Sequence, residues 1–452
     1  MTAQEPSYSG RYIIGIDLGT TNCAMCYIDL DSPIHELHQF DIPQLVAPGE
    51  VASEPLLPSF TYLPGDHELP PEALKLPWDS SKSYAVGHFA REQGSRIPER
   101  LISSAKSWLA HSGVDRTRPI LPWGGDLGSQ MTSPVDVSFF YLDHLRQAWD
   151  SIFKRKKDRD GTPCRLTEQQ IIVTVPASFD EAARELTIAA ARKAGFKNLT
   201  LIEEPLAAFY AWLACHEANW KELVAPSDVI VVIDVGGGTT DFSIVEIDES
   251  FTLRRKAVGN HLLLGGDNMD MALARQAESH WKTRLTQRQW TTLCQECRRA
   301  KETLLGNTPP ESYKVQLRGF GSSVVSGTKS LAFMREQVVD TILEGFFTSI
   351  PVDSPPPERR KGIQEMGLPY AADPTITRHL LQFLRNAGPS LSSPVDLARP
   401  NKVLFNGGAM IPALIRKRIL DVLRDWTEQD NITELETTDF SLAVAQGAAT
   451  YG

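Results

Sequence analysis

The chain has 452 residues, of which 42% are apolar and 23% charged, and these are the proportions of a globular protein. This length exceeds what one hydrophobic core organises, so two large lobes are expected. The formal net charge of −10 argues against nucleic acid or an anionic membrane surface as a partner. No apolar run approaches the roughly 18 residues of a membrane-spanning helix. Because the N-terminus also lacks a signal-peptide pattern, we expect a cytoplasmic protein.

The first predicted element is a hairpin at Tyr12–Asp29, in which an apolar β-branched strand runs into Asp-x-Gly-x-Thr-Thr. A matching hairpin at Val229–Ile247 is built around Asp-x-Gly-Gly-Gly-Thr. Glycines let backbone N–H groups approach phosphate oxygens, and threonine hydroxyls add further donors. An aspartate at a strand end can hold magnesium through water. Two such turns in separate halves of the chain predict two lobes that bind one nucleotide.

The segment after the first hairpin, residues 41–81, is rich in proline, and only Ser59–Leu63 has the pattern of a strand. Apolar residues at helical spacing then predict helices over Arg100–Ala110 and Pro134–Lys156. The sequence therefore predicts little regular structure in residues 41–81.

The next stretch alternates strands and helices. A buried strand runs into a Pro-Ala-Ser turn, and a helix is predicted from about Glu181 to Ala194, where Gly195 ends it. A short strand follows at Leu199–Ile202, and a new helix begins at Pro205. This order predicts an α/β fold with a mainly parallel sheet.

Beyond a predicted lobe boundary at Pro226 and the second hairpin, residues 270–305 are predicted to be helical. The run PVDSPPPERR at residues 351–360 predicts a surface loop, because proline fits neither a helix interior nor a central strand. A strand at Lys402–Phe405 leads into Asn-Gly-Gly, and a helix follows from about Pro412. The chain closes with SLAVAQGAATYG, which predicts a closely packed helix of small residues.

Seven stretches together resemble the actin-like ATPase superfamily and, within it, the nucleotide-binding (ATPase) domain of the 70 kDa heat-shock (DnaK-type) chaperones. They are GIDLGTTN, VTVPASF, LIEEPLAAFYAW, IDVGGGTTDFS, LGGDNMD, RRAKETL and FNGGAMIP, and they span nearly all of residues 11–452. The resemblance is to a bacterial branch, and it implies an actin-like, ribonuclease H-like α/β fold. Its two lobes would each hold a mixed, mainly parallel sheet flanked by helices. Residues 1–225 would form lobe I and 226–431 lobe II, and a C-terminal helix within 432–452 would return to lobe I.

The resemblance implies that ATP or ADP binds with Mg²⁺ at the two glycine turns. Asp17 and Asp234 would hold the metal through water. The phosphate-binding residues implied are Gly19, Thr20, Thr21 and Asn22 in the first turn, and Gly236, Gly237, Gly238 and Thr239 in the second. The phosphate and magnesium site therefore looks complete in the sequence.

The implied catalytic residues are Asp17, Lys106, Glu204, Asp234 and Thr239. Lys106 would reach the γ-phosphate and the attacking water, where a cation offsets charge that develops during phosphoryl transfer. Glu204 would help to hold the magnesium waters or the nucleophile. From the residues alone, Glu204 could also have a purely structural role, because a negative charge stabilises the positive N-terminus of the following helix. Pro176 and Arg184 match a proline and an arginine that relay the nucleotide state, although Pro176 is also an ordinary strand terminator.

The adenosine end departs from the family. The residues implied there are Gly265, Gly266, Arg298, Lys301, Glu302, Leu305, Gly407 and Gly408. Most members carry a glutamate, an arginine and a serine at the positions of Arg298, Glu302 and Leu305. An arginine after Gly408 is missing, and Ser441 takes the place of an aspartate. Lost stacking and base-edge hydrogen bonds would cost about 1–3 kcal/mol of affinity.

The function implied is a chaperone module that hydrolyses ATP slowly and couples hydrolysis to lobe closure and opening. A J-domain co-chaperone, a nucleotide-exchange factor and unfolded clients would act through a C-terminal region that this sequence lacks. Three alternatives remain open. One is a sugar or metabolite kinase, whose turnover would respond to sugars, and another is a cytoskeletal protein, which would scatter light on polymerisation. The third is a degenerate domain that binds nucleotide weakly and turns little of it over.

Overall fold

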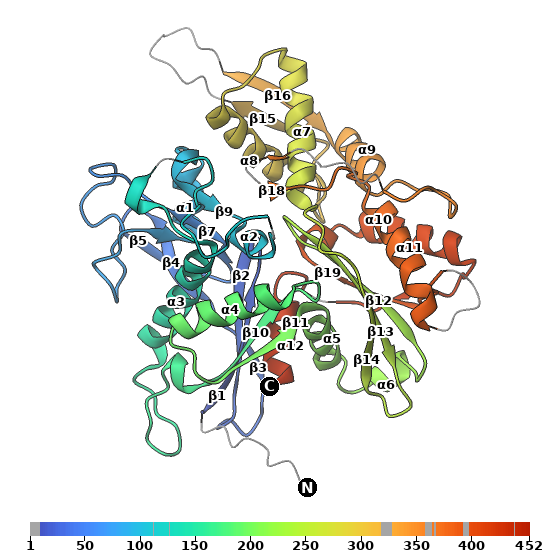
Figure 1. Cartoon of the computed structure of the whole chain (residues 1–452), viewed down its shortest axis with the longest axis horizontal. Helices are drawn as coiled ribbons and strands as arrows, with labels where there is room; N and C mark the ends of the chain where they lie inside the picture. The colour runs from blue at the N-terminus through green and yellow to red at the C-terminus, as the bar shows by residue number, and fades with distance from the viewer. Residues whose placement is uncertain are drawn as a thin grey trace. The chain divides into compact units, whose positions relative to one another are not determined.

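The computed structural model describes residues 10–111, 113–125, 127–317, 328–357, 364–365, 368–391, 397–437 and 439–452. Contacts divide the chain into two compact units, each of which is described by itself (Figure 1). Unit 1 comprises residues up to Gly94, Glu99–Trp220 and Ser441–Gly452, and unit 2 comprises Ser95–Pro98 and Lys221–Phe440. Within the described residues, no helix combines the length and the apolar character that crossing a bilayer requires.

The main sheet of unit 1 has the strand order β11-β10-β1-β2-β3, with β6 paired to β2. The strands are β1 (Tyr12–Leu18), β2 (Asn22–Asp29), β3 (Leu37–Gln39), β6 (Leu57–Pro58), β10 (Gln170–Val175) and β11 (Leu199–Glu203). β1 pairs with β2 in antiparallel fashion and with β10 in parallel. The predicted first hairpin is therefore confirmed, and β10 and β11 are parallel, as the strand–helix alternation predicts.

Two smaller sheets complete unit 1. They are β4 (Ile42–Ala47) with β5 (Glu50–Glu54), and β8 (Ala85–Val86), β7 (Phe60–Tyr62) and β9 (Leu101–Ser103) in that order. The expectation of little structure in residues 41–81 was wrong for β4 and β5, because a two-stranded ribbon has only edge strands and tolerates Pro43. The predicted helix over residues 100–110 was wrong in its first half, since β9 and a left-handed Ser104 (φ 54°) precede the helix.

The helices of unit 1 are α1 (His88–Gly94), α2 (Ala105–Ala110), α3 (Pro134–Phe153), α4 (Glu181–Lys193), α5 (Glu204–Cys215) and α12 (Ala443–Tyr451). Side chains cap two of them, because Ser133 accepts from the N–H of Asp136 and Asp180 accepts from that of Ala183. Gly195, with φ +92°, follows α4 and confirms the predicted helix end.

Small residues bring α12 close to its neighbours. A Cβ added at Gly447 would lie 1.7 Å from the carbonyl oxygen of Ala207 in α5, and one at Gly15 would lie 2.2 Å from that of Ala445. The backbones of α5, α12 and β1 therefore approach one another at distances that only glycine allows. Close packing of the last helix agrees with the prediction from its sequence.

The main sheet of unit 2 has the strand order β14-β13-β12-β19-β20. Its strands are β12 (Val229–Val235), β13 (Thr240–Ile247), β14 (Leu253–Val258), β19 (Lys402–Asn406) and β20 (Thr433–Glu434). β12 pairs with β13 in antiparallel fashion and with β19 in parallel, which is the same arrangement as β1, β2 and β10 in unit 1. The second predicted hairpin is confirmed as well.

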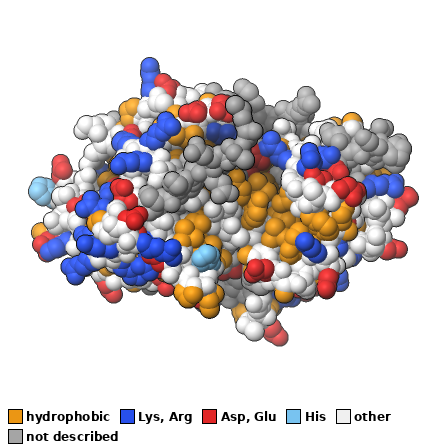
Figure 2. Space-filling model, turned by 90° about the horizontal axis from the view of Figure 1, so that it is seen from below, with side chains coloured by type: hydrophobic (Ala, Val, Ile, Leu, Met, Phe, Trp, Pro, Cys, Tyr) orange, Lys and Arg blue, Asp and Glu red, His pale blue; other side chains and the backbone are white. Residues whose placement is uncertain are grey.

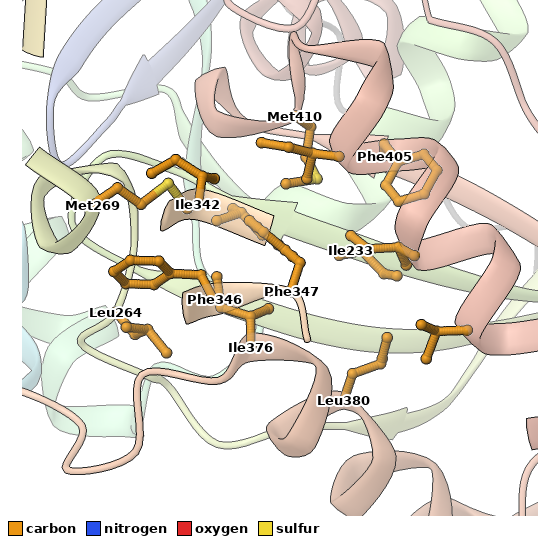
Figure 3. Packing of buried hydrophobic residues seen from close by; sticks show 14 of the residues in the cluster. Ile233, Leu264, Met269, Ile342, Phe346, Phe347, Ile376, Leu380, Phe405 and Met410 are labelled. Atoms are coloured by element: carbon orange, nitrogen blue, oxygen red, sulfur yellow. The ribbon is translucent and has the colours of Figure 1, made fainter. Parts of the chain in front are cut away.

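The remaining elements are α6 (Trp220–Leu223), α7 (Gly266–Trp281), α8 (Gln287–Leu304), α9 (Arg335–Phe346), α10 (Ile376–Ala387), α11 (Ala413–Thr427), β15 (Ser312–Leu317), β16 (Lys329–Met334), β17 (Gln364–Glu365) and β18 (Leu368–Pro369). Figure 3 shows the core of unit 2, where Ile233 and Phe405 of the sheet lie near Phe347, Leu380 and Met410. Residues 351–357 form neither helix nor strand, as predicted, and 358–360 lie outside the described residues.

The domain bounds 1–225, 226–431 and 432–452 stay a prediction. In the described chain, contacts separate the units after Trp220, and the segment that belongs to unit 1 resumes at Ser441. On the face drawn in Figure 2, acidic and basic side chains are intermixed around hydrophobic ones. The negative net charge is therefore not gathered into one acidic patch on that face.

Candidate functional site

The first glycine turn, Gly19–Thr21, is held from one side by Ser59. The hydroxyl of Ser59 donates to the carbonyl of Gly19 at 2.7 Å, and its N–H donates to the carbonyl of Thr21 at 2.8 Å. A Cβ at Gly19 would lie 2.1 Å from the carbonyl oxygen of Asn22, so the turn requires glycine. Across the described chain, no protein acceptor takes the N–H groups of Gly19, Thr20 or Thr21. These donors fit an anionic ligand.

Asp17 lies at the end of β1, just before this turn. The hydroxyl of Thr174 in β10 donates to Oδ1 of Asp17 at 3.1 Å. Burial raises the pKa of Asp17, and the nearby charge of Lys106 opposes part of that shift. A cation beside this buried carboxylate would stabilise its charged form, and the role of Asp17 in holding magnesium stays a prediction.

Lys106 and Glu204 form an ion pair inside unit 1. Lys106 lies in α2, and Glu204 is the first residue of α5. Their side chains are only 7% and 11% exposed. Because Lys106 also acts on the charge of Asp17, three of the predicted catalytic residues lie together. Sequence reasoning placed all three at the site but missed the direct contact between Lys106 and Glu204.

The second glycine turn, Gly236–Thr239, is closed by a hydrogen bond of 2.9 Å from the N–H of Gly236 to the carbonyl of Thr239. Its carbonyl groups face the start of α7. The N–H of Gly266 donates to Gly236 at 3.0 Å, and that of Asp267 donates to Gly237 at 2.7 Å. For Gly237, Gly238 and Thr239, no N–H bond to protein occurs among the described residues. This turn therefore also presents open donors.

Gly265 and Gly266, predicted to contact the adenosine, join α7 to this turn in the structure. A Cβ at Gly265 would lie 2.6 Å from the carbonyl oxygen of Gly236. The N–H of Gly265 donates to the side chain of Asn268 at 2.9 Å. Their role in binding a nucleoside stays a prediction.

Asp234, at the end of β12, is held by β19. The amide of Asn406 donates to Oδ2 of Asp234 at 2.6 Å. Gly407 follows with φ +87°, and a Cβ there would lie 2.7 Å from Oδ1 of Asp234. No contact lies within 4 Å of a Cβ at Gly408. Sequence reasoning assigned the Asn-Gly-Gly turn to the adenosine and missed the bond from Asn406 to Asp234, which the parallel pairing of the two strand ends brings about.

A second carboxylate lies beside Asp234 and was not singled out from the sequence. Asp241 stands directly opposite Asp234 in the β12–β13 register, so both side chains share one face of the sheet. His261 contacts Asp241 at 3.1 Å. The aspartate at each end of DVGGGTTD was the available signal.

The predicted adenine-contacting residues of α8 separate into two groups. Arg298 forms ion pairs with Asp267 and Asp270 of α7, and Lys301 pairs with Asp270 at 2.7 Å. Burial is the main cause of the raised pKa of Asp267. Glu302, one turn further along α8, adds its negative charge to those of Asp267 and Asp270 around Arg298. Glu302 is exposed, and Leu305 packs into the hydrophobic core of unit 2.

The region of Pro176 and Arg184 lies next to the Lys106–Glu204 pair. Arg184 in α4 donates to Glu203 at 2.8 Å, and Glu203 immediately precedes Glu204. The carbonyl of Pro176 accepts from the N–H of Phe179 at 3.1 Å. Their part in relaying a nucleotide state stays a prediction.

Part of this chain is similar to a known protein family. The family model described as "Hsp70 protein" matches residues 127–326. The matches support an Hsp70-type nucleotide-binding domain. The family implies an actin-like ATPase fold, with which the mixed α/β sheets are consistent. The Hsp70 match includes Glu204 and the second glycine turn, whereas Asp17 and Lys106 lie outside it.

Curated relatives are similar to part of this chain. The chaperone protein HscA homolog of Cupriavidus necator is 29% identical over 274 residues, which cover 58% of this chain and 36% of that protein. The chaperone protein HscA of Salmonella typhimurium is 31% identical over 266 residues, with 58% and 37% covered. The chain therefore spans little more than a third of the length of the Hsp70-family relatives that it matches.

Proposed function

We propose that this chain is the ATP-binding and slowly ATP-hydrolysing module of an Hsp70-type molecular chaperone. One observation carries the proposal. A buried lysine–glutamate pair and a buried aspartate, Lys106, Glu204 and Asp17, lie together at a glycine turn whose N–H groups have no protein acceptor in the described chain. The open N–H groups can bind a phosphate, and the lysine can stabilise the charge that develops on it. In unit 2, the turn Gly236–Thr239 has open N–H groups of the same kind, just after Asp234.

The residues divide the work by charge. Asp17 and Asp234 would hold Mg²⁺ through water, and the bound ion would neutralise phosphate charge. Lys106 stabilises the transferring phosphoryl group, for which it exchanges its bond to Glu204 for a phosphate oxygen. Glu204, released from the lysine, then orients the attacking water by accepting its hydrogen bond. The hydroxyl of Thr239 and the N–H groups of both turns fix the phosphates.

The chaperone cycle belongs to the same proposal. ATP binding would draw the lobes together, and hydrolysis and phosphate loss would relax them. A J-domain co-chaperone and an exchange factor would set the pace of this cycle in the cytoplasm. Unfolded clients would bind a region outside this chain. The support for these roles is the similarity to proteins named HscA.

A degenerate domain with weak binding is the second candidate. Arg298 stands at a predicted adenine contact, yet Asp267 and Asp270 already engage its guanidinium. An arginine held in this way has less capacity to stack on a base. Little turnover and an ATP affinity no better than that for inorganic triphosphate would favour this candidate.

The test combines calorimetry and phosphate release on the full chain with Mg-ATP. We expect binding heat, slow phosphate release without any sugar acceptor, and a loss of about 10²–10³ in kcat for Lys106→Ala. Lys75→Ala is the matched control, since Lys75 is half exposed and pairs only with Glu72 in the described residues. Absence of binding heat from folded protein would refute the proposal. Equal turnover in the two variants would refute the role of Lys106.

A further inference from the structure

The helix that carries Lys106 is too short to hold itself in place. α2 has 6 residues, it follows Ser104 in a left-handed conformation, and no side chain caps its start. Helices of this length are unstable in isolation, so tertiary contacts must fix the position of Lys106. α2 packs against α3 and α4, both of unit 1 (Figure 1).

One arginine ties the end of α2 to the start of α4. Nε of Arg116 donates to the carbonyl of His111, the residue that follows α2, at 3.2 Å. Its other two nitrogens donate to the two carboxylate oxygens of Asp180, each at 3.1 Å. The side chain of Arg116 is only 10% exposed. A guanidinium that uses all three nitrogens in this way fixes both orientation and distance.

Asp180 is itself fixed to α4. As the N-cap residue, it accepts from the N–H of Ala183 at 2.7 Å. Its hydrogen bonds to Arg116 hold the pKa of the Asp180 carboxyl below its usual range, so this carboxyl is charged at neutral pH. Arg116 therefore joins α2 to the first turn of a regular 13-residue helix.

The same helix positions the partner of Lys106. Arg184 of α4 donates to Glu203, whose neighbour Glu204 pairs with Lys106. Two connections thus start from α4. One reaches the backbone that follows the helix of Lys106, and the other reaches Glu203 at the end of β11, directly before Glu204. The distance between the two charged groups depends on both.

We infer that Arg116 and Asp180 are positioning residues for Lys106, and that their ion pair sets the rate of phosphoryl transfer without touching the nucleotide. The inference rests on the proposed function. Lys106 must leave Glu204 for a phosphate oxygen, and a helix held at its far end keeps the lysine in reach of both. A displacement of about 1 Å in a catalytic group can cost about 10²-fold in rate.

The test uses the variants Arg116→Gln, Asp180→Asn and their combination in the full chain. Asparagine keeps the N-cap of α4 but loses the charge, so it separates the ion pair from helix capping. Arg118→Gln is the matched control, because Arg118 lies in the same loop, is 77% exposed and pairs with Asp115. We expect kcat for Mg-ATP to fall about tenfold in each single variant, and KM to change by less than about twofold. The combination should lose no more than one single variant.

Hydrogen exchange on the nucleotide-free protein supplies a second measurement. Residues 105–110 should exchange faster in Arg116→Gln and Asp180→Asn than in Arg118→Gln, while α3 is unchanged. The inference is overturned if kcat in both variants matches that of Arg118→Gln, if the two losses multiply, or if kcat falls with no change in exchange at α2. If the unaltered chain hydrolyses no ATP, the proposed function fails, and the exchange data still report whether the pair holds α2.

Discussion

Replacing Gly447 with alanine should destabilise unit 1 far more than a single methyl group would suggest. The added Cβ would lie 1.7 Å from the carbonyl oxygen of Ala207 and 2.8 Å from the backbone nitrogen of Ala211. Both are backbone atoms of α5, so no rotamer change relieves the clash. Ordinary contact needs 3.4 Å, and α12 must therefore move by about 1.7 Å away from α5.

The size of the effect follows from two opposed terms. Alanine in place of glycine inside a helix is worth about 1 kcal/mol in favour of the variant. Overpacking a tight interface costs typically 1–3 kcal/mol and more when only backbone can yield. Because α12 also contacts β1 through Gly15, a shift of the helix disturbs a second interface. We expect a net loss of about 3 kcal/mol in the free energy of unfolding of unit 1.

Urea denaturation followed by circular dichroism would measure this loss. Gly345→Ala is the control, since Gly345 lies inside α9 and a Cβ there would have no contact within 4 Å. Helix propensity should make that variant more stable by about 0.5–1 kcal/mol. A Gly447→Ala protein within about 1 kcal/mol of the original chain would show that α12 does not pack as tightly as described.

Two further predictions concern pH. Burial raises the pKa of Asp17 in the folded protein. Ionisation of Asp17 therefore lowers the free energy of unfolding as pH rises above about 3.9, the pKa of an aspartate in the unfolded chain. Asp17→Asn should therefore raise the melting temperature of nucleotide-free protein at neutral pH but not near pH 3, and it should abolish magnesium-dependent ATP binding. A lower melting temperature at neutral pH would contradict this. His144, which donates to Pro43 at 2.9 Å near Lys82 and Asp143, has its pKa lowered by burial to about 4. The free energy of unfolding should fall as pH drops from about 6.5 to about 4, and it should fall less steeply in His144→Gln. Urea titrations at several pH values would measure this, and an equal fall in both proteins would refute the role of His144.

The hairpins were predictable because their signal is local. An apolar β-branched run, an aspartate, glycines and a second alternating run all lie within Tyr12–Asp29 and again within Val229–Ile247. The ribbon of β4 and β5 was missed because Pro43 lowers the strand signal, although an edge strand tolerates it. Likewise, the apolar spacing predicted one longer helix over residues 100–110, because it gave no sign that Ser104 adopts a left-handed conformation before the helix begins.

The contacts within the candidate site were harder to predict, because they join distant parts of the chain. Lys106 and Glu204 are 98 residues apart, and Asp234 and Asn406 are 172 apart. Sequence pattern and resemblance supplied the residue types, but only the strand register brings the ends of β12 and β19 together. The ion pairs of Arg298 with Asp267 and Asp270 were equally hard to predict, since the two aspartates lie one turn apart on another helix.

The position of α12 has a consequence for synthesis on the ribosome. Residues 443–451 pack against β1, which is translated long before them, so unit 1 lacks part of its interior until α12 has emerged. Apart from Ser95–Pro98, unit 2 is continuous from Lys221 to Phe440 and can mature earlier. During that interval the apolar face of β1 and β2 stays uncovered, and exposed apolar surface of this kind makes incompletely folded chains prone to aggregate.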